Sequence, residues 1–117
     1  MYRLYNQTTG VTLTTHLKLA RTAWERLVGF LDRKAIAPDD AIWFDRCSSV
    51  HTIGMRAPID VIFLNDAYCV LALQRNVSRN RPHISHPGAA SVLEIGASST
   101  DRFRVGDTLT FERAASW

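Results

Sequence analysis

Residues 58–73 read PIDVIFLNDAYCVLAL, and this stretch decides the class of fold. Residues 59–64 are almost wholly apolar, which is typical of a buried strand. The pair Asn65-Asp66 then predicts a turn, because both residue types readily adopt turn conformations. Residues 68–73 are apolar again and are expected to form the partner strand. The centre of the chain therefore predicts a hairpin of two buried strands.

Strand-like segments continue on both sides of this hairpin. Those with apolar or alternating patterns are residues 2–6, 11–15, 41–45, 91–95 and 108–112. Residues 17–20 are short and apolar, so their type stays open. Residues 47–58 have no clean period and predict an irregular segment, and residues 74–88 predict a long loop. The chain thus predicts six or seven short strands.

One helix is predicted near residues 22–31. Thr22 and Glu25 have the spacing of a capping box, in which the two side chains satisfy free amides of the first helical turn. The apolar positions that follow at helical spacing are Trp24, Leu27, Val28 and Leu31. This spacing gives the helix one apolar face.

The length and composition fit one folded domain over residues 1–117. The chain has 117 residues, of which 46% are hydrophobic, and this is enough to bury a core without disulfides or a metal. No apolar run approaches the roughly 20 residues that cross a bilayer. We expect an α+β, mostly β protein: a single compact domain with a curled, barrel-like antiparallel sheet and one main helix.

The charge and the cysteines limit the partners and the compartment. The net charge of +3 is too small to indicate nucleic acid, which requires a clustered basic surface. Cys47 and Cys69 do not form a CxxC motif, and we expect both to be reduced. The first residues, MYRLYNQTTG, lack the basic and apolar regions of a signal peptide. We therefore expect a cytoplasmic protein with no membrane partner.

Two acidic residues stand in apolar strands and mark a candidate site. Asp60 lies in IDVIFL and Glu94 in SVLEI, where a carboxylate must find hydrogen-bond donors or become neutral. Arg56 is only four residues before Asp60 and would compensate its charge, with help from His51. We predict a ligand-binding polar pocket where Arg56, His51, Asp60 and Glu94 converge. The alternative is a structural network, in which Asp60 accepts backbone amides or pairs with Arg56.

Cys47 and His51 are the candidate catalytic pair, since a cysteine–histidine pair can hold a reactive thiolate. Only three residues separate them, and the alternative is a small buried cysteine. A hydrolase or transferase would use this pair, or the carboxylate of Asp60 or Glu94 as a base. The sequence contains no GxSxG, HExxH, P-loop or Rossmann motif. This absence favours a protein that is not an enzyme.

Two histidines of the predicted loop, His83 and His86, form an HxxH pair and are the candidate metal ligands. A metal site usually needs a third ligand in an ordered frame. That ligand would have to come from Asp60, Glu94 or Cys47. An exposed loop with two histidines is the commoner outcome, and we expect no bound metal and no cofactor.

The same loop is rich in arginine. Arg75, Arg79 and Arg81 lie in QRNVSRNRP, which contains no acidic residue. Such a loop can bind phosphate or carboxylate groups or contact a protein partner. It contains no aromatic residue on which bases could stack, which makes single-stranded nucleic acid a poor fit. The alternative is a solvated loop without a partner.

Several segments together resemble a known family. They are RLVGFLDR, AIWF, VHTIGMRAPIDVIFLND, SVLEIGA and VGDTL, in this order over about residues 18–112. They are similar to the domain of unknown function 192 family (DUF 192), a small uncharacterised bacterial and archaeal family. The resemblance implies a compact α+β domain with a curled sheet and no established activity. The family's motif positions correspond here to Gly29, Cys47, His51, Met55, Arg56, Pro58, Asp60, Phe63, Leu93, Glu94 and Gly106-Asp107.

The chain departs from the family pattern at two places. The family's Gly-Leu-Met at the end of the helix is Gly29-Phe30-Leu31 here. The turn after the central strand is Asn65-Asp66-Ala67-Tyr68 and lacks the family's glycine. The loop PHISHPG also differs from the plainer loops expected of the family, so any chemistry of its two histidines would be particular to this chain.

These observations favour a small binding or accessory module. Arg56 would anchor a small anionic ligand or the end of a peptide, while Asp60 or Glu94 would accept hydrogen bonds from it. An enzyme of the hydrolase or transferase type is the first alternative. The second is a protein-interaction domain that uses a sheet edge or the arginine-rich loop.

Overall fold

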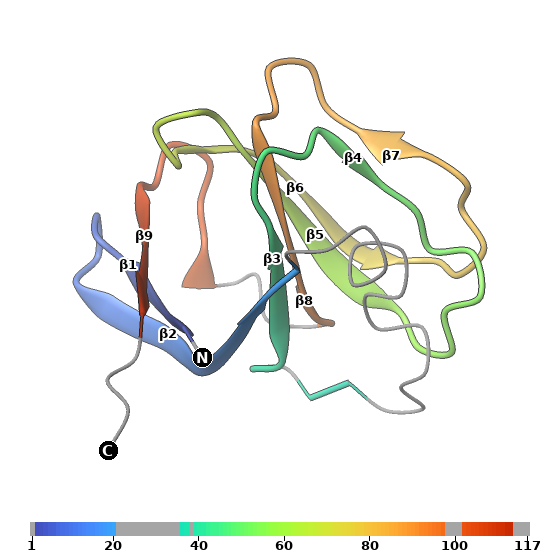
Figure 1. Ribbon diagram of the computed structural model, residues 1–117, viewed down its shortest axis with the longest axis horizontal. Helices are drawn as coiled ribbons and strands as arrows, with labels where there is room; N and C mark the ends of the chain where they lie inside the picture. Colours follow the sequence, from blue (N-terminus) through green and yellow to red (C-terminus); the bar gives the residue numbers. More distant parts are fainter. Residues whose placement is uncertain (1, 21–35, 38, 98–101, 114–117) are drawn as a thin grey trace.

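Seven strands form one sheet that curls into a half-barrel (Figure 1). The computed structural model describes residues 2–20, 36–37, 39–97 and 102–113. The strands of the sheet are β1 (Tyr2–Asn6), β2 (Val11–Leu19), β3 (Ala41–Phe44), β5 (Ile59–Leu64), β6 (Val70–Val77), β8 (Ser91–Gly96) and β9 (Leu109–Arg113). They lie in the order β6-β5-β8-β3-β2-β1-β9. Two shorter strands, β4 (Ser49–Val50) and β7 (Ile84–Ser85), pair separately.

The centre of the sheet matches the apolar runs of the sequence. All six residues of β5 and all six of β8 are buried, as are the four of β3. A strand with both faces covered has no solvent side, so its sequence is a continuous apolar run instead of an alternating one. The predicted strand at residues 59–64 is therefore confirmed at the same bounds, and the prediction of a mostly β fold is confirmed with it.

The curl brings the two edges of the sheet together at one end. Cys69, just before β6, forms a bridge with Thr108, just before β9. The backbone N–H of Val70 donates to the carbonyl of Asp107 at 2.8 Å, and the N–H of Gly106 donates to the carbonyl of Val70 at 2.8 Å. Gly106 has a φ of 96°, which glycine adopts at little cost. The expected barrel-like curl is thus confirmed.

The two faces of the sheet carry separate cores. The inner core draws on all seven strands and lies inside the curl: Leu4, Leu13, Leu17, Ala41, Trp43, Ile62, Leu64, Val70, Leu93, Ile95, Phe103 and Leu109. The outer core lies on the opposite face of β3, β5, β8 and β6: Ala20, Ile42, Phe44, Met55, Ile59, Val61, Phe63, Val77, Ile84 and Val92. Ile84, from the β4–β7 pair, belongs to this outer core.

The expectation of a wholly antiparallel sheet is wrong at one pair. Strands β2 and β3 are parallel, with Leu17 opposite Ala41 and Leu19 opposite Trp43. Parallel neighbours need a long crossover to return the chain to the same end of the sheet, and residues 20–40 provide it. Residues 22–31, for which a helix is predicted, fall within this connection and lie outside the described residues.

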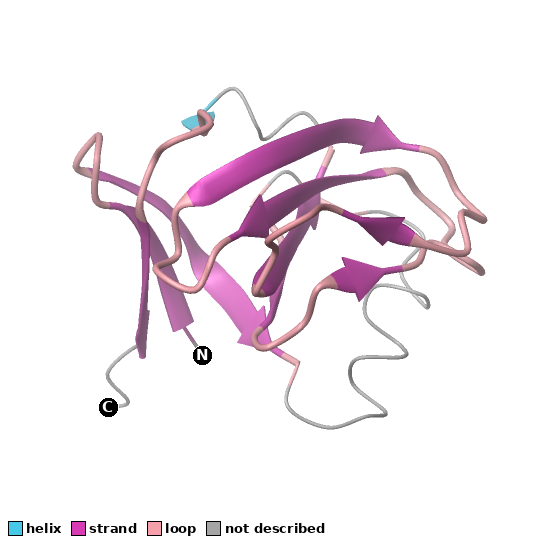
Figure 2. Cartoon of the chain, turned by 90° about the horizontal axis from the view of Figure 1, so that it is seen from above, coloured by secondary structure: helices cyan, strands magenta, loops and turns pink. Residues whose placement is uncertain are grey.

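The described chain is otherwise strand and loop, apart from a short helical turn at Arg102 (Figure 2). No α-helix occurs in the described ranges, so the helical part of the α+β expectation is not borne out there. Within those ranges, no helix has the length and apolar character needed to cross a membrane.

The long loop expected at residues 74–88 is shorter than predicted. Strand β6 continues to Val77, and β7 follows it. The extension was hidden because a bulge interrupts the pairing: Ile59 lies opposite Val77, whereas Val61 lies opposite Gln74. Two residues of β6 therefore face one of β5, which breaks the alternating pattern that a regular strand would show.

Candidate functional site

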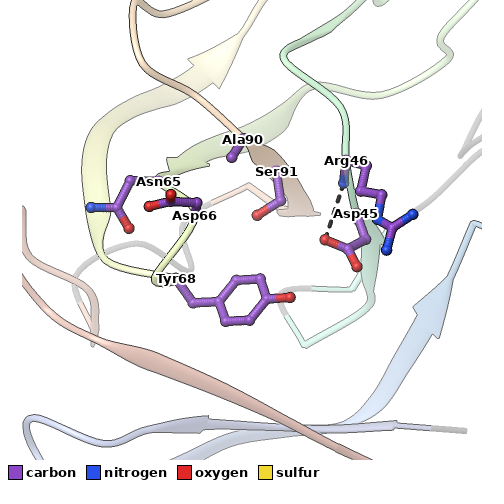
Figure 3. Close-up of a pocket in the computed structure, with 7 residues that line it drawn as sticks. All are labelled: Asp45, Arg46, Asn65, Asp66, Tyr68, Ala90 and Ser91. Carbon is purple, nitrogen blue, oxygen red and sulfur yellow. Dashed lines mark hydrogen bonds between the residues drawn. The ribbon is translucent and has the colours of Figure 1, made fainter.

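The structure contains a polar cavity at the end of the sheet where β3 and β5 finish (Figure 3). Its volume is about 250 Å³. The residues that line it are Asp45, Arg46, Asn65, Asp66, Tyr68, Ala90 and Ser91. Strand β8 lies between β3 and β5 and runs antiparallel to both. The start of β8 therefore lies beside the ends of its two neighbours, which brings these three segments to one place.

A turn built around Asn65 forms one wall of the cavity. The Asn65 side-chain oxygen accepts hydrogen bonds from the backbone N–H groups of Ala67 and Cys69, at 2.9 and 3.0 Å. This asparagine turn holds the segment without the glycine of the family pattern. Tyr68 takes the left-handed conformation there, with a φ of 60°. A bulky residue rarely adopts that conformation, so the surrounding contacts must hold it.

Aromatic contacts hold the ring of Tyr68 in place. The ring packs edge-on against Trp43, with centroids 5.6 Å apart, and against Phe111, with centroids 5.4 Å apart. Trp43 and Phe111 stack on each other in turn. Trp43 lies on β3, in the middle of the sheet order, and Phe111 lies on β9, at one end of it. The inner core therefore fixes this wall of the cavity with rings from two strands that are not neighbours.

The hydroxyl of Tyr68 points toward the side of the cavity that holds Asp45 (Figure 3). Burial raises the pKa of Tyr68 above its usual value, the nearby Asp45 carboxylate raises it further, and the positive charge of Arg46 lowers it. The Tyr68 hydroxyl is therefore protonated at neutral pH. The backbone N–H of Arg46 donates to the Asp45 carboxylate at 3.0 Å.

Ser91 places an unsatisfied hydroxyl in the cavity. The residue is 1% exposed, and its Oγ has no hydrogen-bond partner among the described residues. In Figure 3 this hydroxyl lies between Asp66 on one side and Asp45 on the other, above the ring of Tyr68. A buried hydroxyl without a partner costs about 1–3 kcal/mol. A bound molecule that hydrogen-bonds to Ser91 would remove that cost.

The four residues predicted to share a pocket are not brought together. Asp60 lies opposite Ile95, and Glu94 lies opposite Val61. Neighbouring cross-strand pairs project from opposite faces of a sheet, so Asp60 belongs to the inner face and Glu94 to the outer face. The expectation that these two carboxyl groups meet at one spot is therefore wrong. It failed because each was placed by its apolar neighbours in sequence, which do not reveal the facing strand.

Asp60 has a structural partner at the β6 bulge. It is fully buried, and its Oδ1 accepts a hydrogen bond from the backbone N–H of Asn76 at 2.7 Å. Asn76 has a φ of 50° and belongs to the two-residue bulge opposite Asp60. The bulge interrupts the backbone pairing between β5 and β6, and the Asp60 carboxylate takes the place of the backbone carbonyl that would otherwise accept from the Asn76 N–H. This contact agrees with the structural alternative for Asp60.

Glu94 lies among apolar side chains. Its cross-strand neighbours are Ile42 and Val61, and it is 3% exposed. Burial raises the pKa of Glu94 to about 8, because an apolar environment disfavours the charged form. Glu94 is therefore mostly protonated at neutral pH.

Arg56 and His51 flank a turn that is organised by Thr52. The Thr52 hydroxyl donates to the carbonyl of Ser78 and accepts from the N–H of Arg81, both at 2.8 Å. Arg56 is exposed, and no hydrogen bond or ion pair joins it to Asp60 in the described part of the chain. The Nδ1 of His51 is buried with no hydrogen-bond partner among the described residues. That Arg56 and His51 bind a ligand stays a prediction.

The remaining candidates lie apart from the cavity. Cys47 donates its thiol to the carbonyl of Ser49 at 3.0 Å, and no hydrogen bond links it to His51 within the described ranges. His83 is exposed, and His86 contacts the carbonyl of Pro87. Among the described residues, no group of three or more His, Cys, Asp or Glu side chains is arranged to hold a metal ion.

The three loop arginines, Arg75, Arg79 and Arg81, are exposed. Arg81 reaches the side chain of Gln74 at 3.3 Å. A partner for this loop stays a prediction.

The cavity residues were missed in the sequence, although a signal was present. Two apolar strands each end in a polar pair, Asp45-Arg46 after AIWF and Asn65-Asp66 after VIFL. Ser91 opens the apolar run SVLEI and shares a face with Leu93 and Ile95 of the inner core. Polar residues at adjacent strand ends gather at one edge of a sheet, but only the strand order shows which ends are adjacent.

The comparison with known families decides the membership of this chain. The family described as "Uncharacterized ACR, COG1430", domain of unknown function 192, matches residues 4–111. The chain belongs to the DUF192 family. The resemblance seen in the central block and in SVLEIGA is thereby confirmed.

Two solved structures and one further protein are similar to this DUF192 chain. A crystal structure of a protein of unknown function from Novosphingobium aromaticivorans is 20% identical, with a TM-score of 0.78 over 93% of this chain and 82% of that one. A structure described as a putative transcription regulator from Sinorhizobium meliloti is 25% identical, with a TM-score of 0.77 over 94% and 91% of the two chains. The protein named putative glutamate–cysteine ligase 2 from Bradyrhizobium diazoefficiens is 30% identical over 111 residues. The match includes 81% of this chain but only 26% of that relative's length.

Proposed function

We propose that this DUF192 chain is a binding module that takes a small polar molecule into the cavity between Asp45, Asp66 and Ser91. The observation that carries the proposal is the buried Ser91 hydroxyl, which faces the cavity and lacks a hydrogen-bond partner among the described residues. Buried polar groups in folded proteins are normally satisfied. A ligand with a complementary donor or acceptor would satisfy this one.

The geometry favours binding over acid–base catalysis. Asp60 and Glu94 face opposite sides of the sheet, so they do not form a catalytic pair of carboxyl groups. Cys47 is hydrogen-bonded to a carbonyl group, which does not activate a thiol. The predicted role as a binding or accessory module is therefore kept. The site proposed for it is the cavity near Ser91, while ligand binding by Arg56 and His51 stays a prediction.

The proposal is tested by the Ser91→Ala variant. Removing the hydroxyl takes away an unsatisfied buried group, so the variant should be as stable as the wild type or more stable by about 1 kcal/mol. It should also bind small polar molecules more weakly in a thermal-shift or NMR screen. Ser85→Ala is the matched control, because Ser85 is exposed on β7. A Ser91→Ala protein that keeps every ligand response of the wild type would refute this site.

A further inference from the structure

We propose that an arginine-rich surface, separate from the cavity, binds an acidic segment of a partner protein. This arginine surface consists of the exposed residues Ile53, Arg56, Arg79 and Arg81. The first two come from the turn that precedes β5, and the other two come from the loop that follows β6. The turn and the loop lie side by side, on the side of the molecule away from both termini (Figure 1).

Hydrogen bonds of Thr52 join the turn to the loop. The N–H of Thr52 donates to the carbonyl of Arg81, and the N–H of Asn80 donates to the carbonyl of Thr52, both at 2.8 Å. The N–H of Gly54 donates to the side-chain oxygen of Asn80 at 3.1 Å. Thr52 is 1% exposed, so water does not compete for its bonds. The turn and the loop are therefore held together before a partner binds, which lowers the cost of binding.

Buried anchors in the outer core leave the residues between them on the surface. Met55 belongs to the outer core, and its N–H closes the turn by donating to the carbonyl of Thr52 at 3.1 Å. Ile53, at the tip of this turn, is 50% exposed. Val77 and Ile84 are buried in the same core on either side of the loop, and all residues between them are exposed. The side chains of the arginine surface are therefore accessible.

The turn and the loop carry positive charge without an acidic residue. Residues 47–59 and 74–86 contain four arginines and no aspartate or glutamate. The next acidic residue along the chain, Asp60, is fully buried and accepts a hydrogen bond from the N–H of Asn76. The two segments therefore attract a negatively charged partner.

The arginine surface is distant from the cavity. Arg56 precedes the start of β5, whereas Asp66 of the cavity follows its end, and a strand of 6 residues is about 20 Å long. Asp39 and Asp40 lie at the same end of the sheet as Arg56, but they precede β3, which β8 separates from β5. The arginine surface is thus a site of its own, and either proposal can fail without the other.

The combination of arginine with an exposed apolar side chain favours a protein partner. Guanidinium groups bind carboxylates through paired hydrogen bonds. The guanidinium of Arg81 reaches Gln74 with one nitrogen, which leaves its other N–H groups for a partner. Protein interfaces join apolar contacts with arginine and are poor in lysine, and residues 47–59 and 74–86 contain no lysine.

Nucleic acids and membranes match this surface less well. The same two segments contain no Phe, Tyr or Trp on which bases could stack. Membrane insertion usually requires an extended apolar face, whereas the arginine surface offers Ile53 alone.

Fluorescence anisotropy of labelled probes, titrated with the full chain at low salt, tests the proposal. The probes are a peptide of about eight glutamates with a central leucine, the same peptide with serine in place of leucine, and a single-stranded DNA of equal charge. The leucine peptide should bind most tightly, because it contacts both the arginines and Ile53. Its affinity should fall as salt is added, since exposed charges are screened. Vesicles that contain phosphatidylserine should not sediment the protein.

Three variants assign the binding to the arginine surface. Arg79→Glu should weaken binding of the leucine peptide at least about threefold, and Ile53→Ser should remove the advantage of leucine over serine. Arg113→Glu is the matched control, because it makes the same change of charge at an exposed position on β9, at the other end of the sheet order. It should leave the affinity close to that of the wild type. All three positions are exposed, so the variants should melt at the wild-type temperature.

Four results would overturn the proposal. Equal weakening by Arg79→Glu and Arg113→Glu would mean that the peptide responds only to the net charge of the protein. Tighter binding of the DNA would assign the surface to nucleic acid, and sedimentation with the vesicles would assign it to a membrane. Absence of binding by both peptides would leave the surface without an acidic partner.

Discussion

Replacing Glu94 by glutamine should flatten the pH dependence of this protein's stability. Glu94 is 3% exposed, and its pKa is about 8 in the folded chain against an ordinary value of 4.5. Between these two values the folded state keeps a proton that the unfolded state releases. The folded state therefore binds more protons, and the free energy of unfolding falls as the pH rises from about 4.5 to about 8. Above pH 8 both states have lost the proton, and this dependence ends.

The size of the effect follows from the difference between the two pKa values. About 3.5 pH units correspond to about 5 kcal/mol of unfolding free energy, at about 1.4 kcal/mol per unit. Between pH 5 and pH 7, Glu94 alone should lower the stability by about 2–3 kcal/mol. Glutamine has nearly the shape of protonated glutamic acid and carries no charge at either pH. The Glu94→Gln variant should therefore lack this slope and gain on the wild type as the pH rises.

Urea unfolding at pH 5, 6, 7 and 8, followed by tryptophan fluorescence, measures the effect. Trp43 is buried in the inner core and reports the loss of packing. The difference in stability between wild type and variant cancels the titration of all other groups. Glu112→Gln is the control for the removal of a carboxylate that is not buried, because its side chain is 44% exposed. If Glu94→Gln has the same slope as the wild type, Glu94 is not held protonated by burial and the reasoning is refuted.

Three further substitutions test contacts that hold the sheet together, each by urea unfolding. Asp60→Ala should cost about 1–3 kcal/mol, because the N–H of Asn76 loses its acceptor; a variant as stable as the wild type would show that the bulge does not need this carboxylate. Thr52→Val should cost about 2 kcal/mol, because the hydroxyl bonds to the carbonyl of Ser78 and to the N–H of the loop beyond it are both lost, whereas Thr52→Ser should stay close to the wild type. Gly106→Ala should cost about 1 kcal/mol through its φ of 96° alone, because no atom lies within 4 Å of the added methyl group; an unchanged midpoint would contradict this.

The apolar pattern was enough to find most strands of the main sheet, whereas the short strands β4 and β7 fall in segments predicted as irregular or loop. Strand β5 was predicted at its observed bounds, and β1, β3, β8 and β9 within a residue at each end. The apolar segment at residues 17–20, whose type was open, belongs mostly to β2. The extension of β6 to Val77 was missed, since a bulge removes the period on which such a prediction depends. The parallel pairing of β2 and β3 was missed as well, because strand direction depends on the path of the crossover.

The candidate site shows which properties the local sequence pattern cannot predict. Asp60 and Glu94 were correctly singled out as carboxyl groups in apolar strands, and both are buried. Their separation onto opposite faces follows from the register between β5 and β8. The sequence of one strand shows which of its side chains share a face. The register between two strands, however, depends on turns, bulges and packing elsewhere.

The amino-acid sequence by itself determined the strand-rich class of the fold, the buried acidic residues and the membership of the DUF192 family. These properties depend on residue type and on spacing along one segment. Only the tertiary structure decided the order of the strands, the closure of the half-barrel near Cys69 and the cavity beside Ser91. The lining of that cavity comes from three strand ends that are distant along the chain. They meet because β8 packs between β3 and β5, and this depends on contacts throughout the sheet and not on any local pattern.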